Sequence, residues 1–442
     1  MKKGGGKRFP VTDSSVPSPT PAPKFSPPPF VSGLVCLVCG EHVLPGNHLT
    51  CPHCGIQGIL DVQYDEASAF SRLASQISAR PHDQWRYREL IPVSPDVAFP
   101  HLHIGWTPVY DVPRLARVVG IRKLALKDDG RNPTNSFKDR ASAVGVMKAI
   151  EFGFDSIACA STGNAASSLA GLSAAVGLKS FIFVPQRAPE PKVTQLLVFG
   201  SAVVRVEGTY ENAFDLCRQA CEEYGWYNRN SGTNPYLVEG KKTAGLEIGE
   251  QMAKELPDWV VVSVGDGCTI GGIGKGLQEM KRFGFIDRMP RLLGVQAEGS
   301  CPIVDAFRSG KDLVPGGAGT IADSIAVGTP RNWRRAIQEV KASQGQMMTV
   351  SDGEILEAIR MTARLGGVFG EPAGVTGVAG LKKAVEQGIV GRDESALVVV
   401  TGNGLKDIQS ARRASGEELR IPPTMQALVD ALFHSHPSSQ KH

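Results

Sequence analysis

Seven short apolar runs, separated by longer stretches with helical spacing, constrain the fold of this chain more than any other feature. The runs are KLALK (123–127), SIACA (156–160), KSFIFVP (179–185), AVVRVEG (202–208), WVVVSVG (259–265), RLLGVQAE (291–298) and ALVVVTG (396–402). Their Val, Ile and Leu residues are continuous rather than alternating with polar ones, which is typical of parallel strands buried on both faces by helices. The sequence therefore predicts an α/β fold, with ligands bound at the carboxyl ends of the strands.

The composition excludes several classes of protein. Hydrophobic residues make up 42% and charged residues 21% of the 442 positions, and no apolar run approaches the roughly 18 residues that span a bilayer. The net charge of +4 is small and lies largely in the N-terminal MKKGGGKR, so neither a membrane nor a nucleic-acid partner is expected. Nine cysteines, an odd number, without a secretory segment indicate a reducing compartment, and we expect a cytoplasmic protein.

The N-terminal region differs in composition from the rest. Residues 1–30 contain VPSPTPAPKFSPPPF, and this proline content predicts a disordered arm. A transit peptide is the alternative for this basic, acid-poor arm, although an amphipathic Arg/Ser pattern is missing. Residues 31–65 form a separate cysteine-containing module, and the final HSHPSSQKH has the composition of a frayed tail.

Two Cys-x-x-Cys turns within the module predict a metal site, with Cys36, Cys39, Cys51 and Cys54 as ligands. Two turns that each present two thiolates match tetrahedral Zn²⁺, and glycines at 40 and 55 allow the tight turns of a zinc ribbon. A closed site of four thiolates has no open position for a substrate, so the zinc would be structural. The alternative is a degenerate ribbon that keeps its shape without metal.

The segment NPTNSFKDR (132–140) places one lysine, Lys138, between a predicted strand and a predicted helix. A lysine near a helix N-terminus and beside Arg140 experiences a positive potential, which favours the neutral amine that can attack an aldehyde. An isolated lysine is usually a solvated surface residue, so the interpretation depends on the neighbouring loops.

Three further loops follow predicted strands directly. STGNAAS (161–167) opens a helix whose backbone N–H groups can hold a carboxylate, and GDGCTIGG (265–272) has glycines that let backbone amides surround a phosphate. TGNG (401–404) places a hydroxyl beside a flexible turn. Each loop alone is weak evidence, but three of them together with the lysine loop indicate one ligand site.

These motifs, together with CLVCG, CPHCGIQGILDVQYD, WRYRELIPV, GWTPVYDV, NPYLVEGKKT, FGEPAG and TGNGLKD, resemble the threonine synthase family of pyridoxal-phosphate enzymes of fold type II. The resemblance covers about residues 33–410. It implies a catalytic region at 66–415 built from two open, mainly parallel α/β domains, the smaller inserted at roughly 140–240. A C-terminal helix and tail would follow at 416–442, and homodimers are common in the family.

The resemblance also implies roles for individual residues. Lys138 would anchor the cofactor and move protons at the substrate carbons, Asn164 would bond the pyridine 3-hydroxyl, and Thr401 would meet the pyridine nitrogen. Thr401 as a simple strand-end cap is the alternative. The remaining residues would bind the cofactor phosphate (Gly265, Asp266, Gly267, Cys268, Thr269), the substrate carboxylate (Ser161, Thr162, Asn164) or the substrate phosphate (Lys192, Asn230, Ser231).

The implied reaction eliminates phosphate from O-phospho-L-homoserine and adds water at Cβ to give L-threonine, a small-molecule amino-acid conversion by a lyase. A related β-replacement or β-elimination enzyme, similar to cysteate synthase or to serine/threonine dehydratase, is the alternative. A non-catalytic protein with a degenerate enzyme body is a third hypothesis, and it predicts a missing lysine or broken cofactor loops.

Several positions depart from the family pattern and bear on the substrate. Leu237 stands where the family usually has an arginine that grips the substrate phosphate, which a leucine cannot do. One extra residue precedes Asn234, the GDGCT loop is closer to that of cysteine synthases, and Asn403 replaces a usual histidine. Lys241 or Lys242 are candidates to compensate for the missing arginine.

Overall fold

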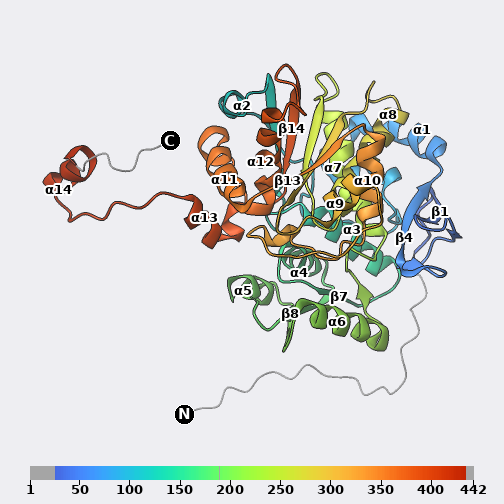
Figure 1. Cartoon of the computed structure of the whole chain (residues 1–442). Coiled ribbons are helices and arrows are strands. Elements are labelled where there is room, and N and C mark those ends of the chain that lie inside the picture. Colours follow the sequence, from blue (N-terminus) through green and yellow to red (C-terminus); the bar gives the residue numbers. More distant parts are fainter. Residues whose placement is uncertain (1–24, 189, 435–442) are drawn as a thin grey trace, which may run out of the picture.

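A computed structural model describes residues 25–188 and 190–434, and three sheets organise this part of the chain (Figure 1). Most of the predicted Pro-rich arm, residues 1–24, and the end of the predicted tail, residues 435–442, lie outside the described residues. All seven predicted runs form strands: β6, β7, β8, β9, β11, β12 and β14. The α/β fold class is therefore confirmed.

The first sheet belongs to the N-terminal ribbon and has the strand order β2-β1-β4-β3, with antiparallel pairing. Its strands are β1 (Val31–Cys36), β2 (His42–Val43), β3 (Thr50–Cys51) and β4 (Gly55–Tyr64). Gly40 and Gly55 have φ values of +75° and +55°, which glycine adopts without the steric penalty of a Cβ atom. The tight turns predicted at these two glycines are confirmed.

The second sheet is parallel throughout and has the order β10-β7-β8-β9. Its strands are β7 (Ser156–Ala160), β8 (Lys179–Pro185), β9 (Ala202–Val206) and β10 (Tyr227–Asn228). The helices between them are α4 (Asn164–Val176), α5 (Glu190–Val198) and α6 (Tyr210–Tyr224). In the chain, this whole unit lies between β6 and β11, two strands of the third sheet.

The third sheet has six strands in the order β13-β12-β11-β14-β6-β5, and only the edge strand β5 is antiparallel to its neighbour. Its strands are β5 (Val109–Asp111), β6 (Lys123–Asp128), β11 (Trp259–Ser263), β12 (Arg291–Ala297), β13 (Gln346–Val350) and β14 (Ser395–Val400). Because the strands of each parallel sheet end at one edge, the loops after β6, β11 and β14 lie together.

The helices of the third sheet and of its connections bury the apolar strand faces. They are α1 (Glu66–Gln76), α2 (Pro113–Val119), α3 (Lys138–Glu151), α7 (Tyr236–Gln251), α8 (Cys268–Arg282), α9 (Pro302–Ser309), α10 (Trp333–Ala342), α11 (Asp352–Gly366), α12 (Pro372–Glu386) and α13 (Ile408–Ala414). Short 3-10 helices are η1 (Ile77–Ala79), η2 (Gln84–Leu90), η3 (Asp129–Arg131), η4 (Asp323–Ile325) and η5 (Gly404–Lys406).

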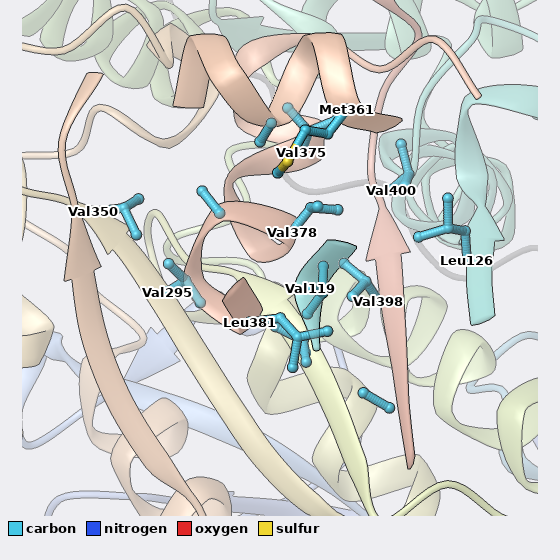
Figure 2. Close-up of a cluster of buried hydrophobic side chains, with 14 of the residues drawn as sticks. Val119, Leu126, Val295, Val350, Met361, Val375, Val378, Leu381, Val398 and Val400 are labelled. Carbon is cyan, nitrogen blue, oxygen red and sulfur yellow. The ribbon is translucent and has the colours of Figure 1, made fainter. Parts of the chain in front are cut away.

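One face of α12 shows how the sheet is covered. Figure 2 shows Val375, Val378 and Leu381, which follow one another at helical spacing, in one apolar cluster with Val295 and Val398 of the strands. All five side chains are completely buried. Burial of each contributes about 1.5–3 kcal/mol, so this helix fixes the strands that position the site loops.

The chain continues beyond α13 to a short helix, α14 (Met425–Val429), and a π-helical turn, η6 (Asp430–His434). Figure 1 shows α14 at the end of an extended stretch, away from the sheets. Among the described residues, no helix has the length and apolar character that a membrane crossing requires.

Candidate active site

Lys138 is the first residue of α3, at the end of a loop whose shape is fixed by its neighbours. Asn135 has a left-handed backbone with φ of +65°, which asparagine tolerates better than most residues. The carboxylate of Asp139 turns back and accepts the Thr134 backbone N–H at 2.6 Å, together with the Thr134 hydroxyl. These bonds hold the loop on both sides of Lys138, whose side chain is left to face the site.

The surroundings of Lys138 lower the pKa of its amine to about 8, chiefly through burial and then through the positive charges of Lys241 and Arg229. The positive potential predicted for this amine therefore comes from Lys241 and Arg229 rather than from Arg140. Arg140 is neutralised by two buried carboxylates at 2.6 and 2.5 Å. With a pKa of about 8, roughly one-tenth of the Lys138 amines are neutral at pH 7.

The loop after β14 is hydrogen-bonded to the lysine loop. The backbone N–H of Phe137 donates to the carbonyl of Thr401 at 2.9 Å, and the Asn403 N–H donates to the carbonyl of Asn135 at 3.1 Å. The Thr401 hydroxyl has no hydrogen-bond partner in the part of the chain that the structure describes. Thr401 is therefore held next to Lys138 with a free hydroxyl.

The loop after β11 forms a tight turn at the N-terminus of α8. Gly267 has φ of +95°, and a Cβ there would come within 2.6 Å of the Asn332 carbonyl oxygen. The helical hydrogen-bond ladder starts with the Gly271 N–H, which donates to the Gly267 carbonyl at 3.0 Å. The preceding N–H groups of this turn are therefore available to an anion, at the positive end of the helix dipole.

The side chains of this turn are bound within the protein. The Asp266 carboxylate accepts the Arg331 backbone N–H at 2.8 Å and the Cys268 thiol at 3.0 Å. Burial raises the pKa of Cys268 to about 12, so the thiol stays neutral. Asp266 and Cys268 both influence the pKa of Lys138, which places the turn beside the amine. Backbone N–H groups, with Thr269 in the first helical turn, remain to bind a phosphate.

The loop after β7 leads into α4, and Asn164 is its first residue. The Asn164 amide donates to the Glu371 carboxylate at 2.6 Å and to the Ser324 hydroxyl at 3.4 Å. Ser161 and Thr162 precede it, and the Ser161 hydroxyl accepts the Gly163 N–H at 3.1 Å. Ser161, Thr162 and Asn164 thus lie at the free N–H groups of α4, where a carboxylate is favoured.

Glu371 is a site residue to which the sequence reasoning gave no role. It is 4% exposed, and burial, reinforced by the charge of Asp323, raises its pKa to about 7. Its backbone N–H donates to the Gly402 carbonyl at 3.0 Å, so it also borders the loop after β14. The motif FGEPAG marked this segment, but nothing in the motif shows that the carboxyl group turns toward Asn164.

The residues predicted to face a substrate phosphate have different surroundings. Lys192 forms an ion pair with Asp323. The Asn230 side-chain oxygen accepts the Ala160 N–H at 3.1 Å at the end of β7, and its amide nitrogen donates to the Cys217 sulfur at 3.9 Å. The Ser231 hydroxyl accepts a hydrogen bond from the Arg229 guanidinium at 3.0 Å. Their substrate roles stay predictions.

Four cysteine sulfur atoms gather in the ribbon: those of Cys36, Cys39, Cys51 and Cys54 all lie within 4.8 Å of one another. Gly58 accommodates this cluster, because a Cβ there would come within 2.6 Å of two of the cysteine side chains. The donor set and spacing suit a tetrahedral metal ion.

The ribbon is fixed to the helices that border the site. Asp61 of β4 pairs with Lys275 of α8 at 2.8 Å and with Arg335 of α10 at 2.7 Å. The Tyr64 hydroxyl donates to Glu239 of α7 at 2.8 Å. Since α7 carries Lys241 and α8 begins at the glycine turn, the ribbon positions two parts of the site.

Comparison with known proteins gives the family. The model of the family described as "Pyridoxal-phosphate dependent enzyme" matches residues 101–402. The chain is 38% identical to the threonine synthase of Methanocaldococcus jannaschii over 397 residues, covering 89% of this chain and 97% of the relative. It is 39% identical to that of Methanosarcina acetivorans over 404 residues, covering 90% and 98%. The chain belongs to the threonine synthase family of pyridoxal-phosphate dependent enzymes.

Solved structures agree on the fold. Threonine deaminase isoform 2 from Solanum lycopersicum superposes with a TM-score of 0.62 at 19% identity, covering 79% of this chain and 93% of that chain. Maize serine racemase superposes with a TM-score of 0.61 at 21% identity, covering 78% and 95%. At such identities the likeness concerns the fold alone, and the predicted fold type II is confirmed.

The described residues fit the cofactor of the threonine synthase family. Pyridoxal phosphate has an aldehyde, a phosphate and a ring nitrogen. Lys138 offers an amine with a lowered pKa, the turn before α8 offers unpaired N–H groups, and Thr401 offers a hydroxyl without a partner. These three groups come from three strand-end loops. Hydrogen bonds join the loops of Lys138 and Thr401, and the turn before α8 lies close enough for Asp266 and Cys268 to influence the pKa of Lys138.

Proposed function

We propose that this chain is a threonine synthase that converts O-phospho-L-homoserine and water to L-threonine and phosphate. The observation that carries the proposal is the position of Lys138 between the Thr401 loop and the turn before α8, with two buried cations, Lys241 and Arg229, close enough to influence its pKa. The relatives named threonine synthase, at 38% and 39% identity over nearly their full lengths, support it.

The reaction requires groups that move protons. Bound pyridoxal phosphate would supply an electron sink that acidifies the substrate Cα–H bond. The Cγ–O bond breaks and its electrons leave with phosphate. One proton leaves Cβ and one is added at Cγ, the hydroxyl of water adds to Cβ, and the remaining proton of water ends on the released phosphate. Lys138 is the base at Cα and, with its pKa of about 8, exchanges protons readily near neutral pH.

Substrate orientation falls to the N-terminus of α4. Its free N–H groups with the hydroxyls of Ser161 and Thr162 would bind the substrate carboxylate, and Asn164 would bond the ring hydroxyl of the cofactor. Glu371, which already holds the Asn164 amide at 2.6 Å, would keep that amide in position. Both roles orient the substrate relative to Lys138.

Loss of an amino group from an unphosphorylated amino acid is the second candidate, because Leu237 cannot bind a phosphate. A threonine synthase must bind the phosphate of its substrate, whereas an enzyme that acts on an unphosphorylated amino acid binds no such anion. Buried cations without carboxylate partners would be unfavourable beside an uncharged leaving group, and Lys241 and Arg229 therefore favour the phosphorylated substrate.

A turnover panel tests the proposal. Purified holoenzyme is given O-phospho-L-homoserine, O-phospho-L-serine, L-serine and L-threonine, and phosphate, threonine and 2-oxo acids are measured. The expected result is equimolar phosphate and threonine from O-phospho-L-homoserine, with slower turnover of the other three. Rapid 2-oxo acid formation from serine or threonine, without threonine from phosphohomoserine, would support the second candidate.

The cysteine cluster leads to a second proposal: Cys36, Cys39, Cys51 and Cys54 bind one structural Zn²⁺. Four thiolates leave no open coordination position for a substrate. Metal analysis of purified protein should find about one zinc per chain, and mutation of a cysteine in the cluster should remove it.

A further inference from the structure

Arg229 is a buried arginine without a carboxylate partner. It follows β10 and is 1% exposed. Its guanidinium donates to the Ser142 hydroxyl at 2.9 and 3.2 Å and to the Ser231 hydroxyl at 3.0 Å. Both acceptors are uncharged, and an arginine has five N–H donors, so neither the charge nor the full set of donors is satisfied. Burial lowers the pKa of this arginine.

The other buried arginines of the described chain each have a carboxylate within ion-pair distance. Arg86 pairs with a glutamate at 2.5 Å, Arg140 with an aspartate at 2.6 Å, and Arg335 with an aspartate at 2.7 Å. A buried charge is costly unless it is paired. The exception at Arg229 therefore indicates that a bound anion completes the pair.

Lys241 is a second unpaired cation in the same region. It is 1% exposed and, within residues 25–188 and 190–434, has neither an ion-pair nor a hydrogen-bond partner. The neighbouring Lys242 is different, since Glu239 and Glu279 hold its amine. Of the two lysines considered as compensation for the missing arginine, Lys242 is already neutralised and Lys241 is free.

The two unpaired cations lie near the reactive amine. Lys241 and Arg229 both contribute to the lowered pKa of Lys138. Ser142, which Arg229 contacts, lies four residues after Lys138 on α3 and hence on the same helical face, with Cβ atoms roughly 5–6 Å apart. The guanidinium thus sits at a hydroxyl one helical turn along α3 from Lys138, which suits an anionic group at the far end of a short amino-acid substrate.

Arg229 also lies beside the position where the family's usual arginine is missing. A Cβ on Gly145 of α3 would meet the Leu237 side chain at 2.8 Å and the Arg229 Cγ at 3.7 Å. The stems of Leu237 and Arg229 therefore contact the same glycine from two different elements. An arginine that enters from the end of β10 reaches the space beside the side chain of residue 237.

We propose that Arg229, with Ser231 and Lys241, binds the leaving phosphate of the substrate and replaces the arginine absent at 237. The proposal rests on the proposed function and names the residues that give it phosphate specificity. A guanidinium can bind two phosphate oxygens at once, while Lys241 adds a second positive charge and the Ser231 hydroxyl fixes the orientation of the fork.

The variants Arg229→Leu, Arg229→Lys and Arg229→Leu/Leu237→Arg test this assignment. The matched control is Arg218→Gln, at a half-buried arginine of α6 that pairs with Glu222. In the holoenzyme, whose cofactor phosphate fills the turn before α8, titration with inorganic phosphate measures the substrate subsite. Arg229→Leu should weaken phosphate binding and raise the KM for O-phospho-L-homoserine by about 30-fold or more. The phosphate affinity and KM of Arg229→Lys should lie between those of the parent protein and those of Arg229→Leu, because lysine keeps the charge but lacks the planar fork of donors.

The double variant Arg229→Leu/Leu237→Arg gives the decisive comparison. Leu237→Arg should restore at least part of the phosphate affinity lost in Arg229→Leu, which a structural role of Arg229 would not explain. Thermal unfolding without phosphate checks folding: Arg229→Leu should be as stable as the parent protein or more stable, since an unpaired buried charge is removed. A clear loss of stability, or unchanged phosphate affinity and KM, would overturn the assignment.

The same titration separates this inference from the proposed function. If the parent protein makes no threonine but binds phosphate through Arg229, the proposed function fails and the anion subsite stands. If threonine forms and Arg229→Leu leaves the subsite intact, the inference fails alone. Weakened cofactor binding with unchanged phosphate binding would assign Arg229 to the cofactor phosphate and overturn the inference.

Discussion

The backbone N–H of Phe137 donates a hydrogen bond of 2.9 Å to the carbonyl oxygen of Thr401. This bond joins the loops after β6 and β14, which are neighbouring strands of the third sheet. Phe137 directly precedes Lys138, so the bond fixes the amine relative to the Thr401 hydroxyl. The predicted anchor for an aldehyde and the hydroxyl predicted to meet a ring nitrogen are therefore held as one unit.

Replacement of Lys138 by alanine should abolish catalysis. In the proposed reaction the amine both anchors the cofactor and exchanges protons, and loss of these roles should lower kcat by about 10³-fold or more. Steady-state phosphate release measures the effect. Lys254→Ala, at an exposed lysine of the loop after α7, is the control and should retain the parent rate. Substantial turnover by Lys138→Ala would contradict the assignment.

The rate at which cofactor attaches to the apoprotein should depend on pH through Lys138. Only the neutral amine attacks an aldehyde, and the pKa of Lys138 is about 8, so the rate should rise with pH and level off above about pH 8. Lys241→Gln removes a positive charge that lowers this pKa, and the midpoint should move to higher pH. Stopped-flow absorbance at several pH values measures both. A midpoint near the ordinary value of a lysine would refute the proposed environment.

Glu371→Gln should change the pH dependence of stability. Burial raises the pKa of Glu371 to about 7, so between its unfolded pKa and pH 7 the folded protein retains a proton that the unfolded chain has lost. The carboxyl group therefore lowers stability as pH rises through this window. Glutamine stays neutral. The free energy of unfolding of Glu371→Gln relative to that of the parent protein should therefore increase by about 3 kcal/mol from pH 4.5 to pH 8.

Thermal unfolding of the apoprotein at several pH values makes this comparison. Glutamine retains an oxygen that can accept the Asn164 amide, so the substitution removes the charge and leaves the contact. A stability difference that is constant over pH would show that Glu371 titrates in the ordinary carboxyl range.

Loss of the zinc proposed for the ribbon should disturb the distant cofactor site. Asp61 and Tyr64 of the ribbon hold Lys275 and Glu239, so a loosened ribbon releases α7 and α8 together. Cys51→Ser should lose its zinc, lower the melting temperature by about 5 °C or more, and weaken cofactor binding. Cys301→Ser, at a cysteine outside the cluster, should change none of zinc content, melting temperature and cofactor binding. Full cofactor affinity in a zinc-free, folded protein would show that the ribbon is not coupled to the site.

Much of the fold was predictable because local sequence determines it. Each of the seven apolar runs became a strand, since continuous Val and Ile residues have few alternatives to burial within a parallel sheet. β13, with its sequence QMMTV (346–350), was missed because its methionines and polar residues give no such run. The edge strand β5 is only three residues long, too short for any periodicity.

The site was predictable only where it depends on motifs. Motif order predicted that Lys138, Thr401 and the turn at 265–269 lie together, and the hydrogen bonds between the loops of Lys138 and Thr401 agree with it. The surroundings of Arg229 and Lys241 were not predictable, because the absence of a carboxylate partner depends on how segments far apart in the chain pack. The two adjacent lysines of GKKT are indistinguishable in sequence, and only packing shows that Lys242 is paired.

The lysine to which the cofactor attaches covalently can be identified in the protein itself. The holoenzyme is reduced with borohydride, digested, and its peptides are analysed by mass spectrometry. The account predicts that the reduced cofactor is found on Lys138 alone, in close to one copy per chain. A label on another lysine, such as Lys241, or a bound cofactor that leaves no label at all, would contradict it.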